Sequence, residues 1–426
     1  MGKQRPDWLT EGWEHIWLPY TQMQLADLPH PVVRAEGCRL HLADGTELID
    51  GISSWWSTCH GYQHPHMVES MQKQLATMSH VMFAGLAHEP AYTLASRLCK
   101  IAPEGLERCF FSDSGSTSVE VALKMALQYW RNTGHSRKNK FICFGNGYHG
   151  DTLGTMSVSG RGAMNSAFDS LMHRHYILDI PTGEYSFAEF TETVESIADT
   201  VAAMIVEPLV QGAGGMKFYS ADILAEMRRV CREHDILLIC DEVMTGFGRL
   251  GTLFACEEAG ITPDILCLGK GLTGGMMTLA ATLCTGKIYD AFLDDSLDKA
   301  LMHGPTFMAN PLGCAAGNAS LDLFEQEPRL EQAEAIEQQM RVGLRPLLGK
   351  KGIKDVRCKG ALGVVQIEGD QQTMFALRPE LTAQGVWLRP FSDVVYIMPP
   401  LVISPDELQQ LIDAVTVTLT KWSASL

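Results

Sequence analysis

The sequence of 426 residues lacks a long hydrophobic run: nowhere do about 18 apolar residues follow one another, the length that a membrane-spanning helix needs. It also lacks the apolar N-terminal core of a secretory signal. Its twelve cysteines are scattered and include no CxxC pair, which in a chain of this length is typical of reduced thiols. These absences together predict a soluble protein of the cytoplasm.

Positive charge is scarce in this chain. Lys and Arg number 34 against 50 Asp and Glu, a formal net charge of −16, and no basic run occurs. Nucleic acids and anionic membranes bind clustered basic side chains, so the sequence argues against both as partners. Charged residues make up only 20% of the chain, below the roughly 25% of an average soluble domain, which favours a surface partly buried in an oligomer.

The middle of the chain alternates short apolar segments with helical ones, which indicates an α/β fold. Short, uniformly apolar strands separated by helices are typical of a mostly parallel sheet flanked by helices on both faces. We predict these strands at 107–113, 141–145, 202–210, 236–243, 264–269 and 279–285. Active sites in such sheets lie beyond the carboxyl ends of the strands, where the polar residues of interest cluster.

The two flanks differ from the middle. Residues 1–60 carry short strand-like pieces around turns, and the chain from about 311 is helical before it gives further strands and a closing helix. We therefore predict a large cofactor-binding domain over 61–315. A smaller α+β domain is predicted from 1–60 together with 316–426.

The strongest chemical pattern is Asp241 followed 29 positions later by Lys270, each at the end of an apolar strand. A lysine directly after a buried strand is costly unless it is paired or covalently used. Pyridoxal phosphate needs this pair of residue types: the lysine forms a Schiff base, and the carboxylate keeps the pyridine nitrogen protonated. A structural Asp–Lys salt bridge accounts for the spacing alone equally well.

A phosphate site is predicted where the segment SDSGSTSVE (112–120) joins a strand to a helix. Gly115, Ser116 and Thr117 there offer backbone N–H groups and hydroxyls at a helix N-terminus. The alternative is a capping box in which Thr117 pairs with Glu120, and the two interpretations are compatible.

Two loops carry further candidates. FGNGYHG (144–150) places Tyr148 on a turn after a strand, where its ring could stack on a cofactor, although an aromatic packed on the surface is the commoner case. HGPTFMANP (303–311) places Thr306 in a loop, where its hydroxyl and N–H could donate to a phosphate.

Two other patterns are less informative. GFGRLG (246–251) matches the letters of a dinucleotide fingerprint, but no helical run opens at Gly251, as that fingerprint requires. His60, His64 and His66 resemble metal ligands, yet no acidic or thiolate partner joins their spacing and a proline interrupts it. We expect a turn with a capping histidine there, and no metal ion.

Taken together, several stretches resemble the class III aminotransferases of the fold-type I pyridoxal-phosphate family. These stretches are, in the order in which they occur along most of the chain, GYHGDTLG, VEPLVQGAGG, CDEVMTGFGR, DILCLGKGLTGG and GPTFMANPLGCAA. The resemblance implies a transaminase that works by a ping-pong cycle with pyridoxal 5′-phosphate. It also implies a homodimer with shared active sites.

The resemblance further implies a role for particular residues. Cofactor binding falls to Gly115, Ser116, Tyr148, Glu207, Asp241, Lys270, Pro305 and Thr306, with Thr306 coming from the neighbouring subunit. Catalysis falls to Lys270, Asp241 and Tyr148. Substrate binding falls to Tyr20, Trp55, Trp56, Arg249, Gly304 and Arg389, of which Arg389 resembles the residue that receives a carboxylate. Two positions depart from the family: Leu250 stands in place of Thr, which puts a hydrogen bond there in doubt, and Gly271 stands in place of Ala.

The resemblance also implies a small-molecule substrate with a long aliphatic spacer between its ketone and its carboxylate. An apolar channel walled by Trp55 and Trp56, with the guanidinium of Arg389 at a distance, suits such a molecule. Adjacent residues on a strand face opposite sides, so we expect only one tryptophan, Trp55, to line the channel. Alternatives are another class III ω-aminotransferase, with a different amine or a different amino donor such as lysine, an aminomutase, and a silent cofactor-binding scaffold.

Overall fold

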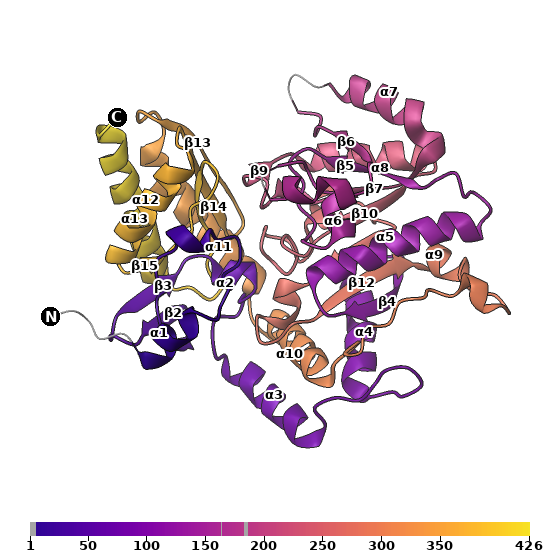
Figure 1. Ribbon diagram of the computed structural model, residues 1–426, viewed down its shortest axis with the longest axis horizontal. Helices are drawn as coiled ribbons and strands as arrows, with labels where there is room; N and C mark the ends of the chain where they lie inside the picture. The colour runs from indigo at the N-terminus through magenta and orange to yellow at the C-terminus, as the bar shows by residue number, and fades with distance from the viewer. Residues whose placement is uncertain (1–5, 163, 183–185) are drawn as a thin grey trace.

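The computed structural model describes residues 6–162, 164–182 and 186–426. Figure 1 shows two lobes side by side, and the first and last described helices, α1 (Asp7–Trp13) and α13 (Pro405–Ala424), both lie in the smaller lobe. In the part of the chain that the structure describes, no helix is long and apolar enough to cross a membrane.

A seven-stranded sheet forms the centre of the larger lobe, in the order β4-β12-β11-β10-β7-β5-β6. The strands are β4 (Leu106–Ser112), β5 (Lys140–Phe144), β6 (Tyr176–Leu178), β7 (Val201–Val206), β10 (Leu237–Asp241), β11 (Ile265–Leu268) and β12 (Ala280–Thr285). β10 pairs in parallel with β7 and β11, and β5 with β6 and β7, whereas β12 runs antiparallel to β4 and β11. The predicted α/β fold with a mostly parallel sheet is confirmed.

Apolar side chains cover both faces of this sheet because successive strand residues point to opposite sides. Ile239 in β10 belongs to the core under α5 (Gly115–Asn132), and its neighbours Leu238 and Cys240 belong to the core on the other face. Helices α4 (Glu89–Ile101), α7 (Phe187–Ile197) and α8 (Ala221–Glu233) contribute to that second core. All six residues of β7 are buried, as a strand covered on both faces requires.

The smaller lobe joins the two ends of the chain in one sheet. Its first sheet has the order β1-β2-β3-β15 and its second the order β13-β14-β16. The strands are β1 (Val32–Glu36), β2 (Arg39–Leu42), β3 (Glu47–Asp50), β13 (Ile353–Lys359), β14 (Leu362–Ile367), β15 (Val386–Trp387) and β16 (Val394–Ile397). Ile49 pairs in parallel with Val386, so residues from both flanks form one structure beside α11 (Arg329–Leu344), α12 (Gln371–Ala383) and α13.

The domain boundaries stay a prediction, and one of them falls inside a helix. The predicted boundary at 315/316 lies within α10 (Pro311–Gln326), which packs against α3 (Pro65–Thr77) and α4 (Figure 1). The next helix, α11, packs instead on β13, β14 and α13 of the smaller lobe. The contacts therefore place the second crossing between the lobes near residues 327–328.

Short elements complete the described chain: 3-10 helices and turns at η1 (Met23–Leu25), η2 (Ser166–Leu171), η3 (Ala198–Thr200), η4 (Ala255–Ala259), η5 (Lys270–Thr273), η6 (Leu297–Lys299) and η7 (Arg345–Leu347), helices α2 (Ser53–Trp56), α6 (Leu153–Ser157) and α9 (Gly286–Asp290), and strands β8 (Val210–Gln211) and β9 (Lys217–Phe218).

The tryptophan pair does not lie on a strand, which corrects the sequence-based prediction. It lies in α2, where φ is 50° at Ser53, 45° at Ser54, 58° at Trp55 and 73° at Trp56, so the turn is left-handed. Such a conformation costs an L-residue about 1–2 kcal/mol. The buried carboxylate of Asp50 stabilises it by accepting hydrogen bonds from the N–H groups of Ile52 (2.9 Å) and Ser54 (2.8 Å).

Candidate active site

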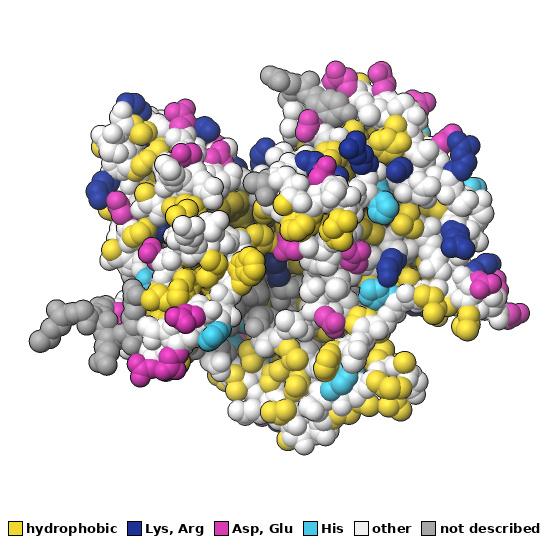
Figure 2. All heavy atoms as spheres, viewed as in Figure 1, with side chains coloured by type: hydrophobic (Ala, Val, Ile, Leu, Met, Phe, Trp, Pro, Cys, Tyr) yellow, Lys and Arg dark blue, Asp and Glu magenta, His cyan; other side chains and the backbone are white. Residues whose placement is uncertain are grey.

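The predicted site residues of the larger lobe gather where β4, β5, β7, β10 and β11 end. Asp241 is the last residue of β10, and Lys270 opens η5 just after β11. Tyr148 and Glu207 follow β5 and β7, and Gly115 opens α5 after β4. Figure 2 shows a hollow between the two lobes with hydrophobic side chains on both rims. The carboxyl edge of the sheet is thus the candidate site.

Asp241 is buried and paired with a residue that the sequence analysis did not select. Its Oδ2 lies 2.7 Å from Nδ1 of buried His149, and its Oδ1 accepts a hydrogen bond of 3.1 Å from the N–H of Val243. Nε2 of His149 is buried and has no hydrogen-bond partner among the described residues. The only sequence signal for His149 was its place beside Tyr148 in GYHG.

Lys270 forms no ion pair with another described residue, so the salt-bridge alternative does not describe this lysine. Its Nζ lies instead 4.3 Å from the ring centroid of Trp56. Burial lowers the pKa of Lys270 to about 8, although the nearby carboxylates of Asp241 and Glu207 act in the opposite direction. The backbone of Lys270 has φ of 44°, a conformation that costs about 1–3 kcal/mol unless its surroundings enforce it.

Glu207 is buried and holds two loops by their backbone. Its Oε1 accepts from the N–H of Tyr148 (2.9 Å) and its Oε2 from the N–H of Gly212 (2.8 Å). Burial raises the pKa of Glu207 to about 7, and Asp241 adds to the shift while His149 opposes it.

The N-terminus of the 18-residue helix α5 lies at the carboxyl edge of the sheet, and the N-terminus of a helix favours an anion. Its capping box pairs Ser114 with Thr117 (Thr117 N to Ser114 Oγ 3.2 Å, Ser114 N to Thr117 Oγ1 2.9 Å). The predicted pairing of Thr117 with Glu120 is therefore wrong, because Glu120 accepts from the N–H of Gly154 (3.0 Å). A Cβ on Gly115 would lie 2.7 Å from Cγ1 of Val243, so a larger residue at the first position of the helix requires Val243 to shift.

Ser116 packs against the loop that carries Tyr148. Its Oγ accepts a hydrogen bond of 3.2 Å from the N–H of Asp151. A Cβ on Gly150, where φ is 126°, would lie 2.2 Å from the same Oγ. The glycine thus lets the two loops approach closely.

Asp151, a second residue that the sequence analysis missed, binds two predicted site tyrosines. It accepts hydrogen bonds from Oη of Tyr148 (2.9 Å) and from Oη of Tyr20, and the two hydroxyls lie 3.1 Å apart. Burial is the main cause that raises the pKa of Tyr20 to about 12 and also raises the pKa of Tyr148. The signal in the sequence was an acidic residue three positions after Tyr148.

The tryptophans of α2 both touch predicted site residues, whereas the expectation of a single channel-lining tryptophan rested on a strand; which of them lines the channel stays a prediction. The Trp55 ring, 38% exposed, meets the ring of Tyr20 edge-on at 6.1 Å, and Cζ of Arg389 lies 4.7 Å from its centroid. Trp56, 8% exposed, contacts Lys270 and donates from Nε1 to Oη of Tyr396 (3.3 Å). The reason is geometric, because successive side chains in a helical turn point about 100° apart and not 180°.

Two predicted substrate-side cations have different surroundings. Arg389 is half-buried and forms no ion pair with another described residue, and burial lowers the pKa of its guanidinium. Arg249 is fully buried, and its guanidinium donates to the carbonyl oxygens of Pro399 (2.7 Å) and Trp56 (3.3 Å). In this arrangement Arg249, which follows β10 of the larger lobe, is tied to α2 and to Pro399 of the smaller lobe, and a contact with substrate there stays a prediction.

The two departures from the family pattern are both buried. Leu250 is part of the core. A Cβ on Gly271 would lie 2.9 Å from Cβ of Phe247, so an alanine there requires Phe247 to shift.

No hydrogen bond between described residues joins the other predicted site residues to the segment with Gly304, Pro305 and Thr306. Gly304 and Thr306 are exposed, and Pro305 is half-buried. Its neighbour His303 lies 3.0 Å from Nζ of Lys124, which anchors the segment to α5.

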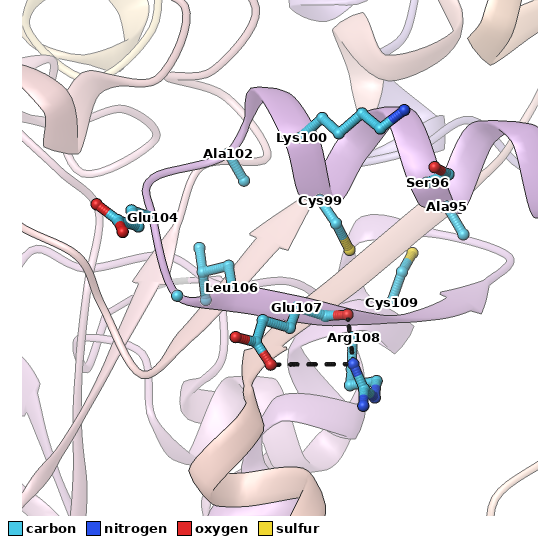
Figure 3. A pocket seen from close by; sticks show the side chains of 11 residues that line it. Ala95, Ser96, Cys99, Lys100, Ala102, Glu104, Leu106, Glu107, Arg108 and Cys109 are labelled. Carbon is cyan, nitrogen blue, oxygen red and sulfur yellow. Dashed lines mark hydrogen bonds and ion pairs between the residues drawn. The ribbon is translucent and has the colours of Figure 1, made fainter.

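Other groups in the molecule do not join this site. His60, His64 and His66 belong to no cluster of metal-ligating side chains within the described residues. A cavity of about 760 Å³ opens between the end of α4 and the start of β4 (Figure 3), and none of the predicted site residues lines it.

The chain is similar to known proteins over almost its whole length. The sequence model of the family Aminotransferase class-III matches residues 20–419. Proteins from Mycobacterium leprae, Synechococcus elongatus and Buchnera aphidicola (Acyrthosiphon pisum) are 45%, 44% and 41% identical, over 94–96% of this chain and 94–97% of their own lengths. Each is named adenosylmethionine-8-amino-7-oxononanoate aminotransferase.

Solved structures are also similar. The enzyme of that name from Methanocaldococcus jannaschii has a TM-score of 0.92 and 33% identity, and the match covers 97% of this chain and 98% of the other. An amine transaminase from an uncultivated Pseudomonas species, in its PLP-bound form, has a TM-score of 0.89 and 32% identity, with 95% and 98% covered.

Proposed function

The chain belongs to the class III aminotransferases, and from this premise we propose that it transfers an amino group from S-adenosylmethionine to 8-amino-7-oxononanoate, giving 7,8-diaminononanoate in biotin biosynthesis. The relatives that carry this activity in their names match almost the whole chain. The N-terminal HIWLPYTQM, the tandem DGISSWWSTCHGYQHP and the segment WLRPFSDVVYIMPP also resemble that enzyme. A cytoplasmic location suits an enzyme of soluble metabolites.

The residues at the carboxyl edge fit pyridoxal 5′-phosphate as the cofactor. Lys270 has an amine without a carboxylate partner among the described residues, and the N-terminus of α5 with Gly115 and Ser116 suits a phosphate. Asp241 supplies a buried carboxylate for a protonated ring nitrogen. The unpartnered Nε2 of His149 beside it is one further polar atom that a bound group could satisfy.

The side chains of this site then have separate tasks. Pyridoxal phosphate, when bound, supplies an electron sink for the electron pair that remains at a substrate carbon when its proton leaves. Nζ of Lys270 accepts that proton and returns it, for which a pKa of about 8 is suited because the amine can be either acid or base near neutral pH. Asp241, oriented by His149 and by the N–H of Val243, holds the ring nitrogen in its charged form.

The residues on the rim of the hollow between the lobes suit the proposed amino acceptor, 8-amino-7-oxononanoate. The guanidinium of Arg389, free of ion pairs with other described residues, can bind a carboxylate, and Trp55 lies against it. An aliphatic spacer can then lie along the tryptophan surface toward Lys270, which contacts Trp56. The hydroxyls of Tyr20 and Tyr148, held by Asp151, border the same space.

A homodimer completes the proposed site. Apolar side chains that are uncovered in the single chain include Met82, Leu86, Tyr92, Leu293, Leu297, Met302 and Phe307. Met302 and Phe307 flank Thr306 in the sequence, and Thr306 has no hydrogen bond within its own chain among the described residues. We propose that a second copy covers these residues, so that Thr306, Gly304 and Pro305 reach the phosphate and the substrate in the neighbouring subunit.

The observation that carries the proposal is that Lys270, with its lowered pKa, and the buried Asp241 lie at the same edge of the sheet. The test mixes the yellow, cofactor-loaded protein with S-adenosylmethionine, lysine, alanine or ornithine, and follows the visible absorbance. We expect S-adenosylmethionine to bleach it and 8-amino-7-oxononanoate to restore it, whereas Lys270→Ala does neither. Bleaching by lysine and not by S-adenosylmethionine contradicts the proposed donor, and a colourless protein with bound nicotinamide contradicts the whole assignment.

A further inference from the structure

The chain crosses between the lobes twice, and the two crossings touch. The first follows α2 and reaches α3 through the segment 57–64, and the second joins α10 to α11 through 327–328. At their meeting point Nε of Arg329 donates a hydrogen bond of 3.0 Å to Nδ1 of His60. Both side chains are almost fully buried, in a place where a polar group is retained only with partners.

The direction of this hydrogen bond decides the protonation of the histidine. A guanidinium has donors only, so Nδ1 of His60 must accept, and the proton of the neutral ring stands on Nε2. Burial and the charge of Arg329 lower the pKa of His60 well below its ordinary value, which keeps the ring neutral. Nε2 then donates to Oγ of Ser320 at 2.9 Å.

The chain of hydrogen bonds ends beside the reactive lysine. Having accepted from His60, the hydroxyl of Ser320 donates to the carbonyl oxygen of Gly271 at 3.2 Å. Gly271 directly follows Lys270 in η5, and Lys270 has the strained φ of 44°. The ring of His60 also packs below the same turn, since a Cβ on Gly274 would lie 3.0 Å from its Cδ2.

We infer that His60 is a positioning residue for Lys270: with Arg329 and Ser320 it forms a one-directional hydrogen-bond chain that links both crossings between the lobes to the turn that presents the lysine. Such a chain supports the strained backbone of Lys270, together with the hydrogen bond of 3.0 Å that the N–H of Gly274 donates to the same carbonyl oxygen of Gly271. It also makes the placement of Nζ depend on how the two crossings lie against each other. The inference rests on the proposed role of Lys270 in holding pyridoxal phosphate.

The test removes single links from the full-length, cofactor-loaded protein. Ser320→Ala breaks the chain at its last step with the loss of one atom. Ser423→Ala is the matched control, because Ser423 is also a helical serine whose Oγ donates to a backbone carbonyl, that of Lys351 at 2.6 Å, but in the smaller lobe far along the chain. His60→Phe removes both bonds of the ring and keeps its contact with Phe324.

The first readout is competition by hydroxylamine, which takes the cofactor carbonyl from Lys270 and so reports the effective concentration of the amine at that carbonyl. We expect Ser320→Ala and His60→Phe to lower the hydroxylamine concentration for half displacement by about 5-fold or more. The second readout is steady-state kinetics. For the same two variants we expect kcat to fall about 10-fold, while KM for the amino acceptor stays within about 2-fold of the parent's value. Ser423→Ala should change neither the hydroxylamine concentration for half displacement nor the kinetic constants, although we expect it to lower the melting temperature as much as Ser320→Ala does.

The outcomes separate the inference from the proposed function. If the unmodified protein never binds pyridoxal phosphate through Lys270, the proposed function fails. If it does, and Ser320→Ala matches Ser423→Ala in the hydroxylamine midpoint and in kcat, then His60 has only a structural role and the inference is wrong. His60→Phe could fail to fold because it leaves Arg329 without one acceptor, and Ser320→Ala then decides by itself.

Discussion

Nδ1 of His149 lies 2.7 Å from Oδ2 of Asp241, and both side chains are buried at the carboxyl edge of the central sheet. The contact orients the carboxylate that we assign to the cofactor's ring nitrogen. It also adds a polar group whose second nitrogen, Nε2, has no partner among the described residues. The sheet thus presents an acid whose geometry is held before any ligand binds.

Removal of the charge from Asp241 should therefore abolish most of the activity. Asp241→Asn keeps the size of the side chain but loses the anion, and we expect kcat/KM to fall by about 100-fold or more. Asp264→Asn is the matched control, since Asp264 is a buried acid directly before β11 and forms an ion pair with Arg228. It should lower the melting temperature and leave the turnover of the remaining folded protein within about 2-fold; equal losses of turnover would contradict the assignment of Asp241.

Burial of Lys270 should make the stability of the cofactor-free protein depend on pH. Its pKa is about 8 in the folded chain and about 10.5 in the unfolded chain, so between these values the unfolded chain binds more protons and stability rises with pH. Lys270→Met removes this dependence. We expect the variant to be more stable than the parent at pH 7, by no more than about 3 kcal/mol, and the advantage to disappear as the pH approaches about 10.5. Urea unfolding of both cofactor-free proteins measures the difference, and an advantage that grows with pH would contradict the lowered pKa.

Arg389 should matter for substrates that carry a carboxylate and for no others. Arg389→Ala removes the half-buried guanidinium beside Trp55, and we expect KM for the oxo-acid acceptor to rise by about 10- to 100-fold. The control is a second substrate that lacks a carboxylate. For the Arg389→Ala variant, the rate of single-turnover bleaching by such a simple amine should stay within about 2-fold of the parent's rate. If both substrates suffer alike, Arg389 supports the fold of the channel and does not bind the carboxylate.

A hybrid dimer tests whether Thr306 serves the neighbouring subunit. We expect Thr306→Ala to weaken cofactor binding by about 10-fold, as the loss of a phosphate contact would. In a hybrid of one Lys270→Ala chain and one Thr306→Ala chain, a shared site combines the intact Lys270 of one chain with the intact Thr306 of the other. We expect one tight cofactor site per hybrid dimer, with half of the parent's activity. If the remaining site instead binds the cofactor as weakly as the Thr306→Ala homodimer, Thr306 acts within its own chain.

Much of the fold and part of the candidate site were predictable from local patterns. Strands such as Leu237–Asp241 are short and apolar because both faces are covered, and the residue that ends each strand could be read directly. For this reason Asp241 and Lys270 could be expected at one edge of the sheet before any contact was known. Strand order, and the passage of α10 into the larger lobe, depend on packing between distant segments and have no local signal.

By itself, then, the sequence determined the α/β class, the family and the residues at the strand ends, since these depend on side-chain period and on residue type. Only the tertiary structure decided which polar groups meet: His149 with Asp241, Asp151 with two tyrosines, and Arg249 with two carbonyl oxygens. It also decided the left-handed turn at Ser53–Trp56, because a conformation that is locally unfavourable forms only where other segments compensate for its cost. Such compensation comes from residues far apart in the chain, and no window of sequence contains it.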